Sequence, residues 1–456
     1  MRNEDRRSIE KKKKVTGEQK LTSGSIPLQL IFFALPFLGS SLIQQLYNMV
    51  DLMFVGKLLG KEASAAVGAS SLLVTCMIGF FTGMGVGVGV AASRCFGSGN
   101  KKELHKVIHT AAGLTLVGSV FLAVVGWIGA PAFLKWMNTP EDIMVLAVAY
   151  IRIYFLSMLS IISYNISSGI LRALGNSKSP MIYQLAGGIA NVLGNILFIY
   201  FLQMGVRGAA LATLLSQSVA AVLAVLHLCR LPEEYRLRPR QIRIHQAICR
   251  QIFSIGIPAA VQSMIITLSN IIVQSRINTL GVDSIAAFTA YFKVENFIYL
   301  PIMAFGQANT TFAGQNIGAG QTERMKKGTR ASLIFGIGVA VVMSSLVLLH
   351  ADSAFGLFTS DLAVMEIGRK LAFTTFPFYF LYVFLEVLSG AIRGTGRAFQ
   401  PMVIIVVNMC VIRILILNVI MILDPSAVGV AHMYPITWLS TSVCMIFCYH
   451  QMTKHL

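Results

Sequence analysis

IPLQLIFFALPFLGSSLIQQLYNMVDLMFVG, residues 26–56, is the stretch that decides the fold. It is apolar over most of its length and long enough to cross the ~30 Å hydrocarbon core of a bilayer as one helix. Pro36 interrupts it, and Gln44, Asn48 and Asp51 follow at spacings of four and three residues, which place them on one helix face. An ionised carboxylate at membrane depth is costly and faces a watered pathway. The stretch therefore predicts a membrane-spanning helix with a cation site at Asp51; the alternative is that Asp51 only reaches water at the helix end.

Composition places the chain among polytopic membrane proteins. Of its 456 residues, 55% are hydrophobic and 12% are charged, whereas about 25% of the residues of a soluble domain are charged. The net charge of +18 does not predict a nucleic-acid partner, because the basic residues lie in short loops between apolar runs, as membrane topology requires. The seven cysteines form no CxxC pair, so neither a disulfide framework nor a zinc site is predicted.

Twelve apolar segments, each near the ~20 residues that a membrane-spanning helix needs, follow one another along the chain. We expect them at residues 26–56, 64–92, 106–129, 143–168, 180–202, 208–229, 249–277, 284–313, 329–350, 363–391, 401–423 and 429–452. The predicted fold class is an all-α integral membrane protein with twelve transmembrane helices.

Charge in the loops predicts the orientation of the chain. An even number of spans places both termini on one side, and the tail at residues 1–25 and the linker at residues 230–248 are both rich in Lys and Arg. Basic flanks stay in the cytoplasm. We therefore expect a multi-pass protein of the inner (plasma) membrane with both termini in the cytoplasm. The tail is also expected to be attracted to anionic lipid.

The sequence repeats itself. SSGILRALGNSKSPM at residues 167–181 matches LSGAIRGTGRAFQPM at residues 388–402, and both stretches follow an apolar segment. FGSGNKKE at residues 96–103 pairs with IGAGQTER at residues 317–324 at the same offset of 221 residues. Two matches at one offset indicate an internal duplication.

Pro36 and Pro258 are related in the same way, at an offset of 222 residues. We therefore predict two homologous six-helix lobes, at residues 26–229 and 249–456, related by a pseudo-two-fold axis along the membrane normal. Duplicated lobes around a central cavity are a transporter design. Duplication for stability of the fold alone is the alternative.

Motifs for enzymatic chemistry do not occur in the sequence. The glycines at residues 83–89 have the spacing of a dinucleotide fingerprint but lie inside an apolar segment with no preceding strand, so close helix packing is their expected role. GKLLGK at residues 56–61 lacks the pattern of a phosphate-binding loop, and no HExxH or GxSxG motif occurs. The chain is therefore not predicted to be an enzyme, and the energy for any transport is expected from an ion gradient.

A second polar cluster lies in ANVLGNILF, residues 190–198. Asn191 and Asn195 are four residues apart and share a helix face. Their amide oxygens can ligate a hard cation or accept from a neighbouring carboxyl group. Asn also joins membrane helices through hydrogen bonds, and the spacing does not decide between these roles. Thr213 is a further candidate hydroxyl ligand.

The second lobe carries four ionisable residues within apolar runs: Lys293, Glu295, Glu386 and Arg413. Two acids and two bases at membrane depth can neutralise each other, so a structural ion-pair network is the first interpretation. A second cation site at Glu295 or Glu386 is the alternative.

Taken together, four features resemble the multidrug and toxic compound extrusion (MATE) family. They are Pro36, the NMVDLMFVG motif that contains Asp51, twelve spans in two repeats, and the SG…R..G…P motif after segments four and ten. The resemblance covers nearly everything from about residue 25 onward. It implies cation-coupled antiport by alternating access, in which Na⁺ or H⁺ enters as organic, often cationic, amphiphiles leave.

Within the family, the sequence is similar to the DinF-like bacterial branch. The resemblance implies a coupling site in the first lobe, on the residues that match Asp51, Asn191, Asn195 and Thr213, with Pro36 allowing the first helix to bend. The branch usually has an aspartate where this chain has Asn195, and the difference removes one formal charge and weakens any Na⁺ site. The NorM-like branch uses acids on segments seven and ten, whereas segment seven here contains none.

In this interpretation the substrate cavity lies in the first lobe, with Gln44, Tyr47, Asn48 and Asn165 as candidate lining residues. The expected partners are a small organic molecule and the bilayer. We expect a monomer with no cofactor beyond the transported H⁺ or Na⁺. Two other functions stay open: a lipid-linked oligosaccharide flippase, which would need a more basic cavity, and a membrane receptor or scaffold that transports nothing.

Overall fold

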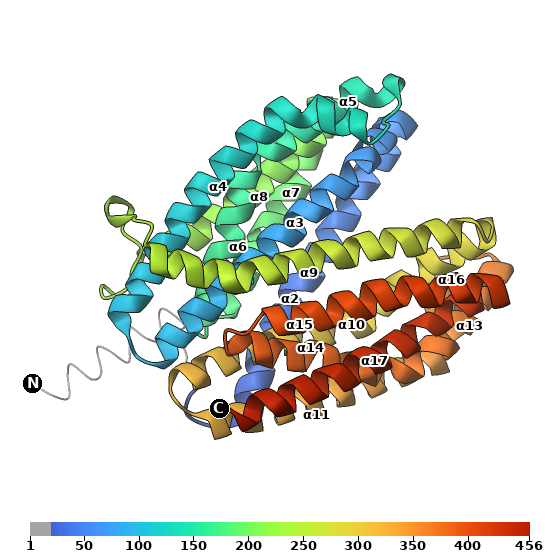
Figure 1. Cartoon of the computed structure of the whole chain (residues 1–456). Helices are drawn as coiled ribbons and strands as arrows, with labels where there is room; N and C mark the ends of the chain where they lie inside the picture. Colours follow the sequence, from blue (N-terminus) through green and yellow to red (C-terminus); the bar gives the residue numbers. More distant parts are fainter. Residues whose placement is uncertain (1–19) are drawn as a thin grey trace, which may run out of the picture. The chain divides into compact units, whose positions relative to one another are not determined.

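The computed structural model describes residues 20–456, apart from the side chains of residues 52, 61, 71 and 72, and this part of the chain is almost entirely helical (Figure 1). Each of the twelve predicted segments coincides with a helix or with helices joined across a short break. The predicted fold class is therefore confirmed. Most of the predicted basic tail, 1–25, lies outside the described residues.

The helices of the first repeat and the linker are α2 (Ile26–Phe54), η1 (Val55–Leu59), α3 (Gly60–Gly97), α4 (Lys101–Trp136), α5 (Glu141–Leu156), α6 (Met158–Ala173), α7 (Lys178–Asn195), η2 (Ile196–Phe201), α8 (Gly205–Cys229) and η3 (Pro239–Gln241). Those of the second repeat are α9 (Gln246–Asn278), α10 (Val282–Gly318), α11 (Thr322–Leu349), α12 (Ala351–Gly356), α13 (Leu362–Thr375), η4 (Phe376–Phe378), α14 (Tyr379–Gly394), α15 (Phe399–Val406), η5 (Val407–Ile412), α16 (Arg413–Leu423) and α17 (Ala427–Lys454). The segments η1, η2 and η5 are π-helical, and η3 and η4 are 3₁₀-helices.

Length and composition allow most of these helices to cross a membrane. Ten helical spans of the described chain qualify, and the number rises to eleven if α5 and α6, bent by 40°, form one span. The remaining predicted segment is α10, which is 37 residues long but contains Asp283, Lys293 and Glu295. Many side chains of α10 are buried within the protein. The helix is thus shielded from lipid and does not need an uninterrupted apolar surface.

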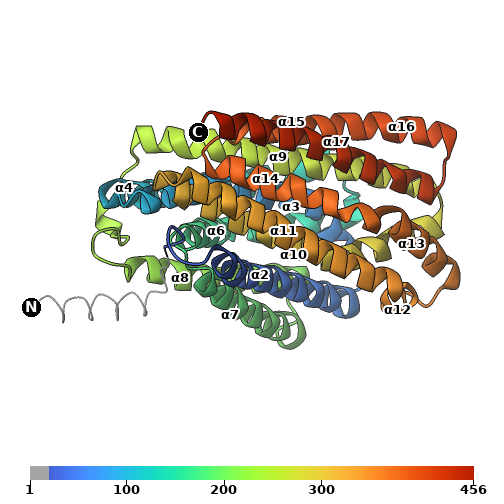
Figure 2. The same ribbon diagram turned by 90° about the horizontal axis from the view of Figure 1, so that it is seen from below.

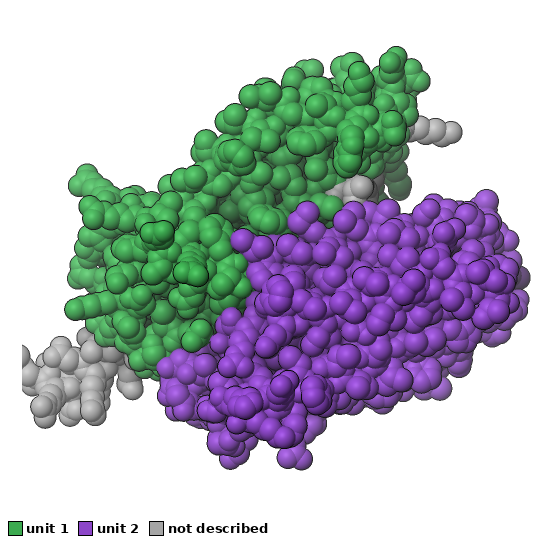
Figure 3. All heavy atoms as spheres, in the orientation of Figure 1, with its two compact units in different colours: residues 1–20, 39–256 green, residues 21–38, 257–456 purple. Residues whose placement is uncertain are grey.

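Contacts divide the chain into two compact units (Figure 3). Unit 1 contains Gly39–Gly256, and unit 2 contains Leu21–Leu38 together with Ile257–Leu456. This division differs from the predicted lobes, 26–229 and 249–456. The start of α2 packs in unit 2, and the linker and the start of α9 pack in unit 1.

Hydrogen bonds explain why the start of α2 belongs to unit 2. The backbone N–H of Leu21 donates to Gln315 Oε1 (2.8 Å). The Leu21 carbonyl oxygen accepts from Asn316 Nδ2 (3.3 Å) and from Arg324 Nε (3.2 Å). The first turns of α2 then join a buried apolar cluster with residues of α10. Hydropathy divides a chain into segments but does not detect tethers of this kind.

The start of α9 is held in unit 1 by a close backbone contact with α3. A Cβ atom on Gly87 would lie 2.6 Å from the carbonyl oxygen of Ile252 and 2.8 Å from Cα of Gly256. Only a glycine allows the two backbones to approach this closely. The glycine run at residues 83–89 therefore serves close helix packing, as the sequence predicts.

Each of the two units contains the same kind of helix crossing. In unit 1, α3 and α6 meet where a Cβ atom on Gly169 would lie 2.9 Å from the carbonyl oxygen of Gly85. In unit 2, α10 and α14 meet where Gly390 lies against Gly306 in the same way. Gly306 and Gly390 follow Gly85 and Gly169 at the 221-residue offset found in the sequence. The internal duplication thus reappears in the packing.

Helix packing within each unit positions the polar residues. In unit 1, α7 packs along α8, and α6 packs against α3 and α8. In unit 2, α10 packs against α11, α13 and α14, while α17 lies along α13, α14 and α16 (Figure 2). Large buried side chains fill the core of unit 2, among them Tyr291, Tyr379 and Trp438.

Candidate functional site

Asp51 on α2 faces the polar stripe of α7. The side-chain amide nitrogen of Asn195 donates to Asp51 Oδ1 (2.8 Å) and to Asn191 Oδ1 (3.2 Å). Asn191 and Asn195 are buried, with 1% and 0% of their surfaces exposed, and Asp51 is half-buried. The structure thus brings three of the predicted site residues together through a single amide group.

Both helices change their geometry next to this cluster. α2 gives way to the π-helix η1 at Val55, and α7 gives way to the π-helix η2 at Ile196, directly after Asn195. Single π-helical turns inside α-helices occur often at functional sites. Two such turns beside one carboxylate favour a functional role over interhelical hydrogen bonding alone.

One turn before Asp51, Tyr47 attaches α2 to two further helices. Its hydroxyl oxygen accepts from Gln184 Nε2 on α7 (3.2 Å) and from Gln217 Nε2 on α8 (3.3 Å). Tyr47 itself is buried. The tyrosine therefore helps to fix the register of α2 against α7 and α8, and with it the position of Asp51, which is a contact that the sequence did not predict.

Four other predicted residues of the first lobe bond to their own helix or are exposed. The hydroxyl of Thr213 donates to a carbonyl of its own helix (3.2 Å), and the amide of Asn165 does the same (2.8 Å). Gln44 and Asn48 are exposed on α2. Among the contacts of the described residues, none of these four side chains forms a hydrogen bond with Asp51.

One oxygen of the cluster has no partner among the described residues, namely the buried Oδ1 of Asn195. The two ends of an amide are assigned from their hydrogen bonds. Half a turn of the amide would present this oxygen to Asp51 in place of the N–H group. The cluster would then offer only oxygen atoms, which suit H⁺ or Na⁺ better than a transition metal.

A tightly bound metal centre is not part of this arrangement. Within the described part of the chain, no three His, Cys, Asp or Glu side chains gather closely enough to hold a metal ion.

The acids of unit 2 accept hydrogen bonds from tyrosines. Glu295 accepts from the hydroxyl groups of Tyr379 (2.8 Å) and Tyr291 (3.5 Å). Glu386 accepts from the hydroxyl of Tyr382 (3.4 Å). Both carboxylates are half-buried. Tyrosine hydroxyl groups on α10 and α14 thus donate hydrogen bonds to both acids.

The bases of unit 2 contact aromatic rings, and Arg413 also interacts electrostatically with Glu295. Lys293 Nζ lies 5.6 Å from the ring centroid of Phe358, and the guanidinium of Arg413 lies 5.2 Å from that of Tyr434. No ion pair within 4.0 Å joins Lys293, Glu295, Glu386 and Arg413 in the part of the chain that the structure describes. Residues 293 and 295, two positions apart, point to different faces of α10.

Sequence reasoning missed Gln184 and Gln217, although a signal for both was present. Gln184 precedes Asn191 by seven residues on α7, and Gln217 follows Thr213 by four residues on α8. Each therefore extends a polar helix face that was already recognised.

A family model described as MatE matches the chain twice, at residues 36–197 and at residues 258–419. The two matches begin at Pro36 and Pro258 and together cover more than half of the chain. The internal repeat predicted from the sequence is therefore confirmed, because each half is matched separately.

Curated relatives match the chain along most of their length. The chain is 29% identical over 393 residues to the probable multidrug resistance protein YpnP of Bacillus subtilis (strain 168), with 86% of this chain and 88% of that protein covered. It is 27% identical over 393 residues to the probable multidrug resistance protein YoeA of the same organism, with 85% of each covered. The names are those of resistance proteins, in agreement with the prediction that the chain is not an enzyme.

The fold also matches a solved structure, that of a multidrug resistance MATE family transporter of the MOP superfamily in an outward-facing conformation. The TM-score is 0.90 at 21% sequence identity, with 95% of this chain and 97% of that chain covered. At this identity the similarity shows the fold alone. The DinF-like branch stays a prediction, because none of these matches distinguishes the branches.

Proposed function

The chain belongs to the MatE family, and from this premise we propose that it is a cation-coupled antiporter. It exports organic, often cationic, amphiphilic compounds by alternating access while H⁺ or Na⁺ enters. The observation that carries the proposal is Asp51, a carboxylate in a membrane-spanning helix that accepts from the Asn195 amide. An ionisable group at this depth is costly to keep and marks an ion pathway.

In the proposed cycle, the amide of Asn195 takes the place of the cation while the site is empty. Its N–H group then donates to Asp51, a contact for which the side chains of Asn195 and Asp51 are already placed. An entering H⁺ or Na⁺ neutralises Asp51, and the amide turns so that its unpartnered Oδ1 accepts from the protonated carboxyl group or ligates Na⁺. Release of the cation restores the N–H bond.

Pro36 links this change to the shape of α2. Proline has no N–H group and its ring displaces the preceding turn, so a helix bends most readily there. Pro36 lies inside α2, two residues before the point at which the helix passes from unit 2 to unit 1. Loss of the bond between Asn195 and Asp51 lets the later part of α2 bend at Pro36, which reshapes the predicted cavity and expels the substrate.

The driving force depends on the charge of the substrate. The membrane potential supplies ~2.3 kcal/mol per charge per 100 mV. Exchange of one monovalent cation for one monovalent organic cation moves no net charge and relies on the concentration gradient alone. Export of a neutral compound would gain the potential term as well.

The chain is a multi-pass membrane protein, and its bacterial relatives imply the plasma membrane. The basic linker supports the proposal that both termini are cytoplasmic. We further propose that the protein acts as a monomer and needs no cofactor besides the transported ion.

Transport in proteoliposomes tests the proposal. The purified protein is reconstituted with a fluorescent organic cation on one side, and H⁺ and Na⁺ gradients are imposed separately. We expect one of the two gradients to drive the dye against its concentration gradient. A protein that moves lipid-linked oligosaccharide but no dye under either gradient would favour the flippase, and one that moves neither would favour a receptor or scaffold.

A further inference from the structure

Residues 231–245, called the strap below, connect α8 to α9 and lie on α4 as an ordered segment. Tyr235 and Leu237 of the strap are buried. Ile244 rests on Gly113 of α4, where an added Cβ atom would lie 2.8 Å from Ile244 Cγ1. The strap is therefore packed against unit 1 along its length and is not a free linker.

His109 in the first turns of α4 holds the strap through one ring nitrogen. Its Nε2 accepts the backbone N–H of Arg238 (3.1 Å), and its Nδ1 lies 2.8 Å from the carbonyl oxygen of His105. A backbone N–H can only donate and a carbonyl can only accept, so the ring proton is on Nδ1 and Nε2 is unprotonated. Because His109 is fully buried, this geometry requires the neutral imidazole.

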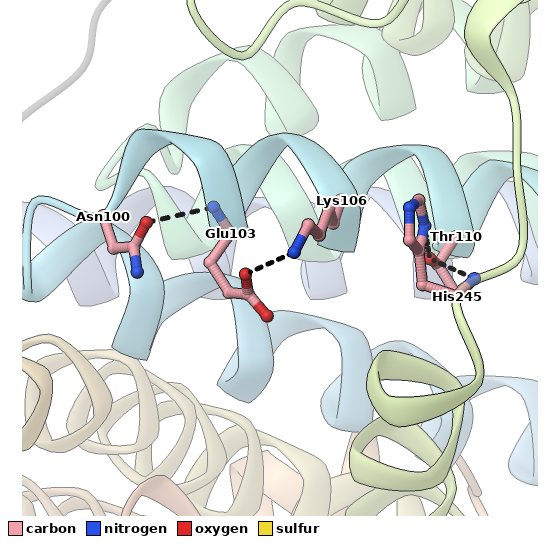
Figure 4. Close-up of polar contacts among 5 residues, drawn as sticks. All are labelled: Asn100, Glu103, Lys106, Thr110 and His245. Carbon is pink, nitrogen blue, oxygen red and sulfur yellow. Dashed lines mark hydrogen bonds and ion pairs between the residues drawn. The ribbon is translucent and has the colours of Figure 1, made fainter.

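A second contact, one residue further along α4, holds the strap independently of any charge on His109. The Thr110 hydroxyl oxygen accepts the backbone N–H of His245 (3.2 Å) and lies 3.3 Å from His245 Nδ1 (Figure 4). Towards the start of α4, Lys101 pairs with Glu234 of the strap (2.7 Å), but both side chains are exposed, and exposed pairs contribute little.

We propose that His109 is a pH-sensitive latch: neutral His109 fixes the strap to α4, and protonation of His109 releases it. A protonated imidazole carries N–H groups on both nitrogens. Nε2–H would then face the N–H of Arg238, so that two donors meet. The hydrogen bond is lost and a buried N–H has no acceptor until the strap moves away and water enters.

The charged groups around His109 favour its neutral form, in which the strap is held. The ring of His105 is stacked on that of His109, with 3.9 Å between the centroids, and the guanidinium of Arg238 interacts electrostatically with His109. A positive charge beside the imidazole disfavours a second one on the ring. The nearby acid of the strap, Glu233, is already paired with Arg238 (2.7 Å), and His245 bonds to the next residue of α4.

Release of the strap acts on α9. The strap runs directly into this helix, whose first turns belong to unit 1 and whose remainder belongs to unit 2. The latch thus sets how firmly the start of α9 is held, on the side that the loop charges predict to be cytoplasmic. The inference goes beyond the proposed function and does not depend on which ion or substrate is transported.

Amide hydrogen exchange of the full-length protein in lipid nanodiscs tests the latch. Exchange of strap peptides is compared between about pH 7.5 and about pH 5, after correction for the intrinsic effect of pH. The lower value is set well below the ordinary histidine pKa of about 6.5, because burial and the neighbouring positive charges favour the neutral form of His109. In the unmodified protein we expect strap exchange to rise about fivefold at the lower pH, the change that loss of one net hydrogen bond brings.

Three variants separate the latch from other effects. His109→Gln keeps an acceptor but cannot be protonated, so its corrected exchange should not change with pH. His105→Gln is the matched control and should respond to pH as the unmodified protein does, and Thr110→Val should raise exchange equally at both values. A pH response that persists in His109→Gln, or no response in the unmodified protein and in His105→Gln, would overturn the proposal.

Discussion

Asp51 in unit 1 and Glu295 in unit 2 are both acids in the membrane-spanning part of a duplicated fold, yet their neighbours differ in kind. Asp51 accepts from an amide that can turn and present an oxygen instead. Glu295 accepts from two tyrosine hydroxyls, which have no such second orientation towards it. At the 222-residue offset that relates Pro36 to Pro258, Asp51 corresponds to the buried Val273.

The comparison teaches that the duplication preserved the scaffold and not the chemistry. The glycine crossings recur in both units, because backbone contact leaves no room for another residue. The polar residues inside each unit have diverged, as Asn165 shows: its counterpart at the 221-residue offset is Glu386. Coupling that resides in one unit alone is the functional consequence we propose, and four sets of substitutions test the comparison between the units.

Asp51→Asn should have the largest effect on transport. The amide cannot bind and release a cation as a carboxylate does, so gradient-driven efflux should fall by about a hundredfold, equivalent to about 2.8 kcal/mol of coupling. Dye efflux from proteoliposomes measures this, with the exposed Asp352→Asn as the control. Efflux of Asp51→Asn at the unmodified rate would remove the basis of the coupling site.

Gly169→Val and Gly390→Val should destabilise the protein to similar extents. Each valine side chain would push against the backbone of the partner helix, at a crossing that occurs once in each unit. Overpacking of this kind costs about 1–3 kcal/mol. Thermal unfolding in detergent measures both variants side by side. If only one of the two lowers the melting temperature, the crossings are not equivalent.

Pro36→Ala and Pro258→Ala should differ from each other. Alanine restores the N–H group and stiffens the helix, so the variant at 36 should slow efflux about tenfold, or about 1.4 kcal/mol. The variant at 258 should change efflux by less than about twofold, since α9 carries no counterpart of Asp51. Initial efflux rates are compared between proteoliposomes that contain equal amounts of each variant. Equal losses in the two variants would argue against a role specific to α2.

Glu295→Gln and Glu386→Gln should have the smallest effects. Glutamine keeps an oxygen that accepts from the tyrosine hydroxyls, so the packing of α10 against α14 should persist. We expect efflux within about twofold of the unmodified protein, less than about 0.5 kcal/mol. A loss as large as that in Asp51→Asn would move the coupling site to unit 2.

Much of the fold could be predicted from the sequence. Hydropathy identifies the segments because each must match the thickness of the bilayer, and the paired motifs at 167–181 and 388–402 reveal the repeat. It could not be predicted that the start of α2 packs in unit 2 and the start of α9 in unit 1. This packing depends on single hydrogen bonds, such as that from Leu21 to Gln315, between residues far apart in the sequence.

Only part of the candidate site could be predicted, because its contacts also join residues far apart in the sequence. Helical spacing brings Asn191 and Asn195 to one face, and membrane energetics single out Asp51. Spacing within a helix says nothing about the rotation of its neighbour, so it could not show that Thr213 bonds to its own helix or that Lys293 turns away from the acids of unit 2.

Ion release on substrate binding tests the central claim most directly. Purified protein in weakly buffered detergent is mixed with an organic cation while pH and Na⁺ are followed by electrodes. We predict release of about one H⁺ or Na⁺ per molecule from the unmodified protein and from Glu295→Gln, and none from Asp51→Asn. Release from Asp51→Asn that equals the unmodified value, together with its loss in Glu295→Gln, would contradict the claim that unit 1 alone couples ion to substrate.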